Sequence, residues 1–289
     1  MKAISSYLYG FSAASKSFRM ITLIYLSYLF IALLVAVPFF GLFQSVAGNR
    51  MLPDDLLKGF DATALRELLS GGGKVFSYYI QAFWPWVFVF LLLQVYLNGG
   101  ILAWISNPRG KFSGALFHRS GRKYFWRFLK LTLYFAIIHL IIALIVYLPY
   151  AMITGSKTGL TDEQIIRPLI VCVSVHLVIL VFIFLLADFT KARIFEQDSS
   201  KVFKSIFKCL KITIKRFFPF YFLGLLLGIL PVLLFVGFYL IRSALVVDST
   251  GLIIIIFVLQ QIMVYARVFL RTWRLAGTYH YYLGISSGS

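Results

Sequence analysis

The feature that most constrains this chain is a set of six uncharged apolar runs, each about the length needed to cross a bilayer. About 20 helical residues span the roughly 30 Å of hydrocarbon. Only 13% of the residues are charged and 61% are apolar, whereas soluble domains carry about 25% charged residues. We therefore predict an all-α polytopic membrane helix bundle with six transmembrane helices, forming a single integral membrane domain over residues 1–289. The predicted spans are Ile21–Phe43, Val75–Ile105, Leu131–Ala151, Pro168–Ala187, Phe217–Ile241 and Ser249–Ala266.

The charged residues indicate the orientation of these spans. The chain has 28 Lys and Arg residues against 10 Asp and Glu residues. Three quarters of the basic residues lie at the N-terminus, in the second and fourth connections and at the C-terminus. By the positive-inside rule, both termini are predicted to be cytoplasmic in the bacterial inner membrane. Because the basic segments alternate with apolar spans, the expected counter-charge is anionic lipid on the cytoplasmic leaflet and not nucleic acid.

The order of basic, outward and returning segments predicts three similar hairpins. The units cover about 1–106, 107–193 and 194–283, and the first contains an outer loop at 44–74. Each unit begins with a basic amphipathic segment, which we predict to be an interfacial helix lying at the membrane surface. These lead-in segments are Ile4–Arg19, Ala115–Lys130 and Ser200–Arg216.

The third lead-in segment has the most regular charge pattern. Its five lysines are spaced by three and four residues, which places them on one helical stripe. They are Lys201, Lys204, Lys208, Lys211 and Lys215, and the second lead-in adds Arg119, Arg122, Lys123 and Arg127. One hypothesis is that these residues bind lipid headgroups or an acidic protein partner. The alternative is ordinary anchoring without a specific ligand, because topology alone requires basic residues on the inner side.

Polar residues inside predicted spans are functional candidates because burying them in hydrocarbon is costly. His139 and His176 lie near the middle of adjacent antiparallel spans, so they are expected to approach each other. Such a pair could relay protons or bind metal, but two histidines without acids or thiols make a poor metal site. We therefore favour neutral, hydrogen-bonded histidines and predict no metal. The amide candidates for interhelical hydrogen bonds are Gln94, Asn98, Gln260 and Gln261.

Two further patterns concern helix ends and helix packing. Asp188 lies at the inner border of the fourth span, and we predict that it pairs there with Arg193, Arg267 or Lys191. Gly224 and Gly228 form a Gly-x-x-x-Gly motif, which permits close helix packing and a possible homo-oligomer.

Motifs for catalysis and cofactor binding are missing from the sequence. The run Gly71–Lys74 is not a Walker loop, because Leu68 and Val75 occupy the positions that need Gly and Ser or Thr. No dinucleotide fingerprint, His-Glu-x-x-His or Cys-x-x-Cys is found. We expect no enzymatic site and no cofactor. The favoured hypothesis is a transport-type or lipid-handling component of unknown substrate, and the alternative is a scaffolding protein whose basic face binds anionic lipid or an acidic partner.

Several short motifs carry a resemblance to a known group of proteins. They are Gly59–Asp61, Asn98–Ile101, Gly121–Arg127, Asp188–Arg193 and Tyr265–Arg267. With these motifs the chain resembles uncharacterised bacterial six-span integral membrane proteins. Its layout is also similar to the membrane domain sometimes fused to glycerophosphodiester phosphodiesterases. The resemblance implies a six-span layout but no activity, because no phosphodiesterase catalytic domain is found in this sequence.

Overall fold

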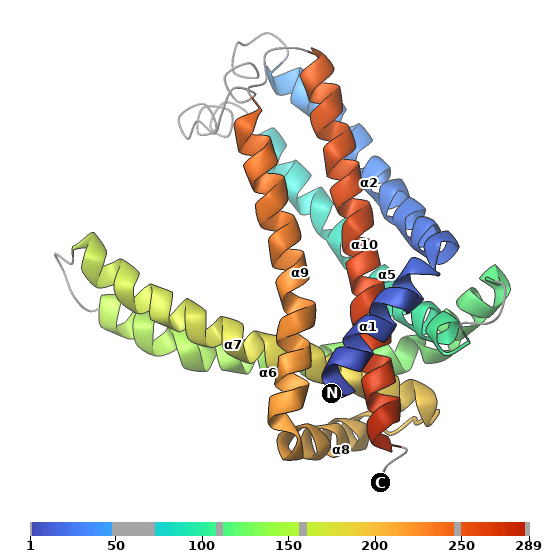
Figure 1. The fold of residues 1–289 in the computed structure, drawn as a ribbon. Helices are drawn as coiled ribbons and strands as arrows, with labels where there is room; N and C mark the ends of the chain where they lie inside the picture. Colours follow the sequence, from blue (N-terminus) through green and yellow to red (C-terminus); the bar gives the residue numbers. More distant parts are fainter. Residues whose placement is uncertain (1, 48–72, 108–111, 156–160, 246–249, 287–289) are drawn as a thin grey trace. The chain divides into compact units, whose positions relative to one another are not determined.

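The computed structural model describes residues 2–47, 73–107, 112–155, 161–245 and 250–286. Within these ranges every regular element is an α-helix (Figure 1), which confirms the all-α prediction. The helices are α1 (Lys2–Ser15), α2 (Phe18–Ala47), α5 (Gly73–Ile105), α6 (Gly114–Gly155), α7 (Asp162–Glu196), α8 (Val202–Lys215), α9 (Phe217–Ala244) and α10 (Thr250–Ser286). Most of the predicted outer loop at 44–74 lies outside the described residues.

Six of these helices are long and apolar enough to cross a membrane. They are α2, α5, α6, α7, α9 and α10, and each contains one of the predicted spans. The protein is therefore a multi-pass membrane protein in architecture. Prolines lie inside five of the six, but a proline is tolerated in such a helix when neighbouring groups satisfy the freed carbonyl.

Two of the three lead-in segments form helices separate from the span that follows. The first is α1, which ends at Ser15 before α2 begins at Phe18, and the third is α8, which ends at Lys215 before α9. The second lead-in, Ala115–Lys130, is different because α6 runs without a break from Gly114 to Gly155. Its basic residues thus lie on the first turns of a long helix that continues into the span.

The chain divides into two compact units. Unit 1 consists of Met1–Lys16, Val95–Leu230 and Arg271–Ser289, and unit 2 consists of Ser17–Gln94 and Pro231–Leu270. Unit 1 contains all of α1, α6, α7 and α8. Its core is aromatic, with fully buried side chains that include Phe117, Phe128, Phe189, Phe220 and Tyr282.

In unit 2 the described polar contacts follow one face of α2. Tyr25 donates a hydrogen bond to Gln261 Oε1 at 2.9 Å, and Tyr28 donates to Gln94 Oε1 at 2.8 Å. The hydroxyls of Thr22 and Tyr265 are 3.2 Å apart. A hydroxyl at every third residue of α2 therefore links it to α5 and α10, which is the ordinary role of polar side chains between membrane helices.

Close helix packing in unit 1 depends on glycines of α1 and α5. Trp273 Nε1 donates to the Tyr7 carbonyl at 2.8 Å, and a Cβ at Gly10 would lie 2.7 Å from the Trp273 carbonyl oxygen. A Cβ at Gly99 would lie 2.8 Å from the carbonyl oxygen of Ser120 on α6. Since that oxygen belongs to the backbone, it has little freedom to move away, and only glycine allows this approach of α5 to α6.

Replacing Gly99 with alanine should lower the free energy of unfolding by about 1–3 kcal/mol, because the added methyl group overpacks the α5–α6 contact. The matched control is Gly228→Ala on α9, where no atom lies within 4 Å of the added methyl group. The control should keep or slightly raise stability, since alanine favours a helix over glycine by up to about 1 kcal/mol. Thermal unfolding in detergent measures both, and equal midpoints would contradict the packing argument.

Candidate functional site

The most deeply buried ionic contact centres on Asp188, near the end of α7. Its side chain is 1% exposed. Lys191 Nζ donates to Oδ1 at 2.7 Å, and Arg274 Nε from α10 lies 2.7 Å from Oδ2. The second contact is an ion pair whose geometry falls outside that of a hydrogen bond. Each carboxylate oxygen thus has its own cation, as a charge buried away from water requires.

A neighbouring contact brings α5 into this cluster. Arg271 Nη2 donates to Asn98 Oδ1 at 2.6 Å, and the Arg271 charge also acts on Asp188. Both Asn98 and Asp188 are buried. We call Asn98, Asp188, Lys191, Arg271 and Arg274 the ionic cluster. It joins α5, α7 and α10 within unit 1.

The predicted ion pairs of Asp188 need correction. Lys191 is a partner as expected, but Arg274 takes the second position, and Arg193 forms no ion pair among the described residues. Arg193 lies five residues after Asp188, which turns it to another face of α7, and Arg267 belongs to unit 2. The sequence contained one signal that could have identified Arg274 as a cluster residue. Arg271 and Arg274 are three residues apart and therefore share one face of α10.

Replacing Asp188 with asparagine should lower the free energy of unfolding by about 3–5 kcal/mol, because it leaves the largely buried Lys191 ammonium and the shielded Arg274 Nε without an opposite charge. Glu163→Gln is the matched control, since it breaks the exposed pair of Glu163 and Arg167 at the other end of α7. An exposed pair contributes at most about 1 kcal/mol. Thermal or denaturant unfolding compares the two variants. Equally small losses of stability in both would show that the ionic cluster does not hold the helices together.

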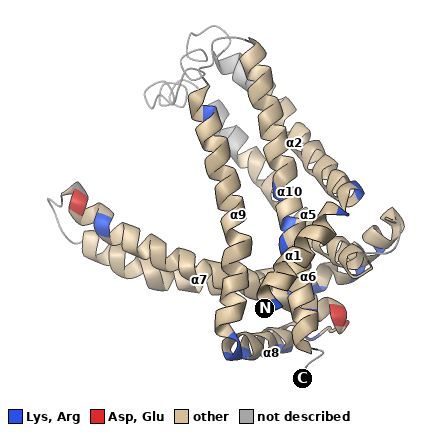
Figure 2. Cartoon of the chain, in the orientation of Figure 1, with Lys and Arg blue, Asp and Glu red and all other residues tan. Residues whose placement is uncertain are grey.

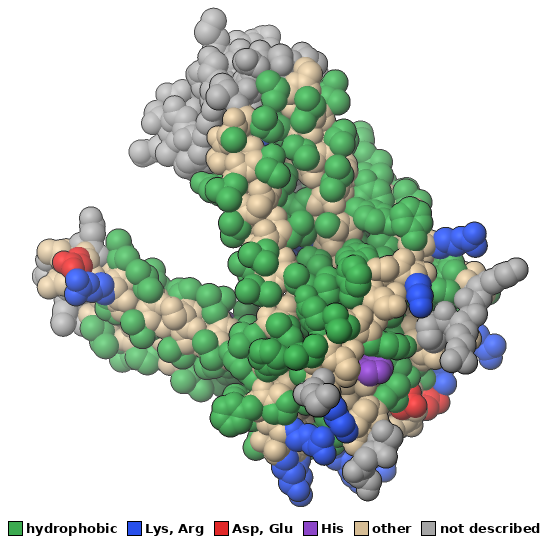
Figure 3. Space-filling model, viewed as in Figure 1, with side chains coloured by type: hydrophobic (Ala, Val, Ile, Leu, Met, Phe, Trp, Pro, Cys, Tyr) green, Lys and Arg blue, Asp and Glu red, His purple; other side chains and the backbone are tan. Residues whose placement is uncertain are grey.

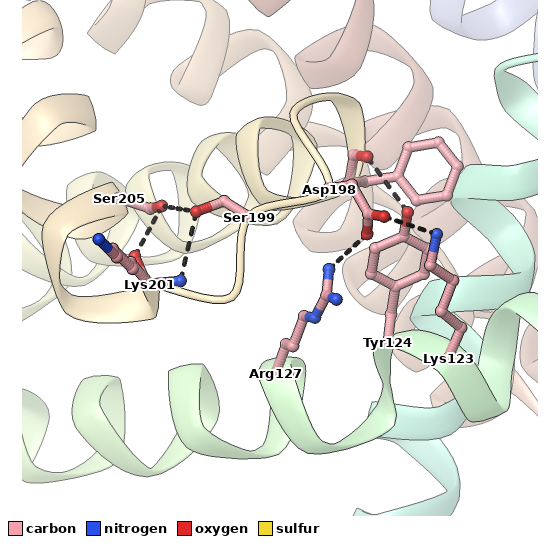
Figure 4. A network of polar contacts seen from close by, with 8 residues as sticks. Lys123, Tyr124, Arg127, Asp198, Ser199, Lys201 and Ser205 are labelled. Atoms are coloured by element: carbon pink, nitrogen blue, oxygen red, sulfur yellow. Dashed lines mark hydrogen bonds and ion pairs between the residues drawn. The ribbon is translucent and has the colours of Figure 1, made fainter.

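A second ionic contact lies on the connection between α7 and α8 (Figure 4). Lys123 Nζ donates to Asp198 Oδ2 at 2.8 Å, and Arg127 Nη1 donates to Oδ1 at 2.5 Å. Asp198 has a φ of 44°, a left-handed conformation that aspartate tolerates better than most residues. Tyr124, between the two cations on α6, donates to the Phe195 carbonyl at 3.3 Å.

This contact changes the interpretation of the second lead-in. One hypothesis assigned Lys123 and Arg127 to headgroups or a partner and the alternative to ordinary anchoring, but both bind Asp198 within the chain. Arg119 and Arg122 are exposed on the same helix. This role of Asp198 was not predictable from the sequence, because its position depends on the turn that follows α7. The two donated hydrogen bonds, from Lys123 first and then Arg127, lower the pKa of Asp198 to about 2.

The Asp198 contact should resist acid. Its pKa in the folded protein lies below the ordinary value of about 3.9, so the contribution of the contact is complete above about pH 4 and is lost as the pH falls through about 2. Carbon NMR of labelled aspartate carboxyls in nanodiscs measures this titration. The control is the double variant Lys123→Met/Arg127→Met, in which the pKa should return towards 3.9. A wild-type titration near pH 4 would contradict the assigned contact.

Helix α8 presents three distinct faces. One face is buried against the rest of unit 1 and consists of Val202, Ser205, Ile206, Cys209 and Thr213. A second face is apolar yet exposed, with Phe203, Phe207 and Ile214 each more than half exposed. The third face is the predicted lysine stripe, and all five lysines are exposed. Figure 2 shows the basic residues gathered along α8, and Figure 3 shows basic side chains projecting from this part of the molecule.

The two intramembrane histidines lie together, as expected. The ring centroids of His139 on α6 and His176 on α7 are 4.9 Å apart with the rings nearly perpendicular, and Tyr147 lies 5.3 Å from His176. His176 Nδ1 is shielded from solvent and has no hydrogen-bond partner in the described part of the chain. No group of three or more His, Cys, Asp or Glu side chains among the described residues could hold a metal ion.

The remaining candidates take structural positions. Gln94 and Gln261 accept hydrogen bonds from α2, whereas Gln260 is exposed. A Cβ at Gly224 would lie 3.0 Å from Leu185 Cδ2, so this glycine packs against α7 of the same chain, and a dimer through the Gly-x-x-x-Gly motif stays a prediction.

Comparison with known proteins assigns this chain to no family. No protein-family model, curated protein or solved structure matches the chain. The resemblance to bacterial six-span membrane proteins therefore stays a prediction, and the function must be argued from the residues themselves.

Proposed function

We propose that this protein is a multi-pass component of the bacterial cytoplasmic membrane that handles anionic phospholipid at its inner face. In this proposal both termini are cytoplasmic, and the protein has no enzymatic site of its own. The observation that carries the proposal is the three-faced helix α8, with one face packed on the protein, one exposed and apolar, and one lined by lysines.

The lysine stripe supports binding of anions from outside the chain. None of Lys201, Lys204, Lys208, Lys211 and Lys215 forms an ion pair with an acid in the described residues. The acids nearest in sequence are already engaged, Asp198 with two cations and Glu196 with the Tyr279 hydroxyl. Near an anionic membrane surface each such lysine contributes about 1 kcal/mol of attraction.

The apolar face favours lipid over an acidic protein as the anion. Phe203, Phe207 and Ile214 lie beside the lysines and are 58%, 55% and 61% exposed. A helix with this pattern rests at the headgroup boundary, with its apolar side chains among the acyl chains and its lysines reaching the phosphates. An acidic protein partner would bind the lysines and leave this apolar face uncovered. The scaffolding alternative explains only half of the exposed surface of α8.

The buried face fixes α8 in place and distinguishes it from a loose anchor. Phe189 of α7 and Cys209 of α8 are both fully buried, and the Cys209 Sγ lies 4.0 Å from the Phe189 carbonyl oxygen. Ser205 Oγ donates to the Lys201 carbonyl and lies 3.5 Å from Ser199 Oγ in the preceding turn. A lipid attracted by the lysines would thus meet a helix already held against α7, which supports a role in handling lipid beyond anchoring.

Reversing the charge of the stripe should remove the preference for anionic lipid. Spin-labelled phosphatidylglycerol and phosphatidylcholine are compared in bilayers containing the protein, and the ratio of their association constants is measured. The variant Lys204→Glu/Lys208→Glu/Lys211→Glu should lower this ratio at least about fivefold, the equivalent of about 1 kcal/mol. The matched variant with arginine at the same three positions should keep the ratio. If the glutamate variant has the same ratio as the wild type, the proposal that α8 binds anionic lipid is wrong.

A further inference from the structure

Arg193 is a buried cation that forms no ion pair with any acid in the described residues. It lies in the last turn of α7, and the residue is 9% exposed. Its Nε is shielded from solvent and has no hydrogen-bond partner in the described residues. Such a charge is strongly unfavourable unless an anion accompanies it, because burial removes its hydration.

The acids of the surrounding helices are all committed elsewhere. Asp188 binds Lys191 and Arg274, and Asp198 binds Lys123 and Arg127. Glu196, one turn after Arg193, accepts a hydrogen bond from the Tyr279 hydroxyl at 2.5 Å. Glu163 pairs with Arg167 at the opposite end of α7. None of these carboxylates forms an ion pair with Arg193.

Two neutral groups lie within range of the Arg193 charge, the Cys209 thiol of α8 and the Tyr282 hydroxyl of α10. Burial raises the pKa of Cys209 to about 11, so the thiol stays protonated at pH 7. The Tyr282 oxygen accepts a hydrogen bond from Gln197 Nε2 at 3.2 Å, and its own proton remains for another acceptor.

We propose that Arg193, with the Tyr282 hydroxyl beside it, binds one phosphate-bearing anion at the junction of α7, α8 and α10. A guanidinium matches the oxygens of a phosphate with two parallel donors. Two sources share this chemistry, the phosphodiester of an anionic phospholipid and free phosphate. The first source would deepen the proposed function by adding a single defined site beneath the lysine stripe, whereas the second would be independent of it.

The experiment measures thermal unfolding of the full chain in a neutral detergent without added anions. Dipalmitoylphosphatidylglycerol is added in one arm and sodium phosphate in the other, with phosphatidylcholine and sodium chloride at equal ionic strength as references. Saturating ligand should raise the wild-type midpoint by about 5 °C. A response to the phosphatidylglycerol arm alone identifies the lipid headgroup, and a response to phosphate identifies free phosphate.

The variant Arg193→Met separates an anion site from a structural arginine. Removing an unbalanced buried charge should leave the anion-free midpoint unchanged or higher, and should abolish the response to either anion. Arg167→Met, which removes an exposed arginine at the opposite end of α7, should keep the wild-type response. Arg193→Lys keeps the positive charge but loses the two parallel donors of the guanidinium. It should weaken the apparent affinity for the anion about tenfold.

Several outcomes would overturn the site. They are a wild type that responds to neither anion, an Arg193→Met variant that responds like wild type, and a requirement for Arg193 for folding in anion-free detergent. The result is separable from the lipid preference of α8. An α8 lipid preference that the glutamate variant leaves unchanged, together with an intact Arg193 response, would refute the proposed function alone. A preference that the glutamate variant abolishes, together with no Arg193-dependent response, would refute the Arg193 site alone.

Discussion

The hydrocarbon of a bilayer offers no hydrogen-bond partner to the peptide backbone, and this constraint governs the whole chain. Every amide and carbonyl in a span must be satisfied within the protein, which helices achieve by themselves. The long uninterrupted helices follow directly, including α6, which extends from Gly114 to Gly155. Side chains that would demand water are then restricted to a few places, and at most of the described ones neighbouring helices supply partners.

The distribution of acids determines which cations remain available. In unit 1 the few described carboxylates lie close to basic side chains or a hydroxyl, at Asp188, Glu196 and Asp198. Because acids are so scarce, most basic residues cannot be neutralised within the chain. The surplus is arranged in two ways: the lysines of α8 are exposed to the surroundings, whereas Arg193 is enclosed between helices.

The fold was predictable where one physical effect dominates. The apolar runs located all six long helices. Counting residues along antiparallel spans predicted that His139 lies near His176, and the structure confirms it. The buried face of α8 was not predictable, because Cys209 and Thr213 belong to a segment dominated by basic residues, and their burial depends on how α8 packs on the rest of unit 1. Lys191 was predicted as a partner of Asp188, but Arg274 was not, since its position depends on the rotation of α10 about its axis, which hydropathy does not encode.

The two ionic contacts near the end of α7 differ in their exposure to solvent, and this difference has a mechanical consequence. Asp188 is enclosed, so dissolved ions scarcely weaken its attraction to Lys191. Asp198 is open to water, with half of its side chain exposed, and mobile ions screen such contacts over about 8 Å at physiological ionic strength. The contact that fastens α6 to the turn before α8 therefore weakens as the salt content of the surrounding medium rises, while the contact between Asp188 and Lys191 does not.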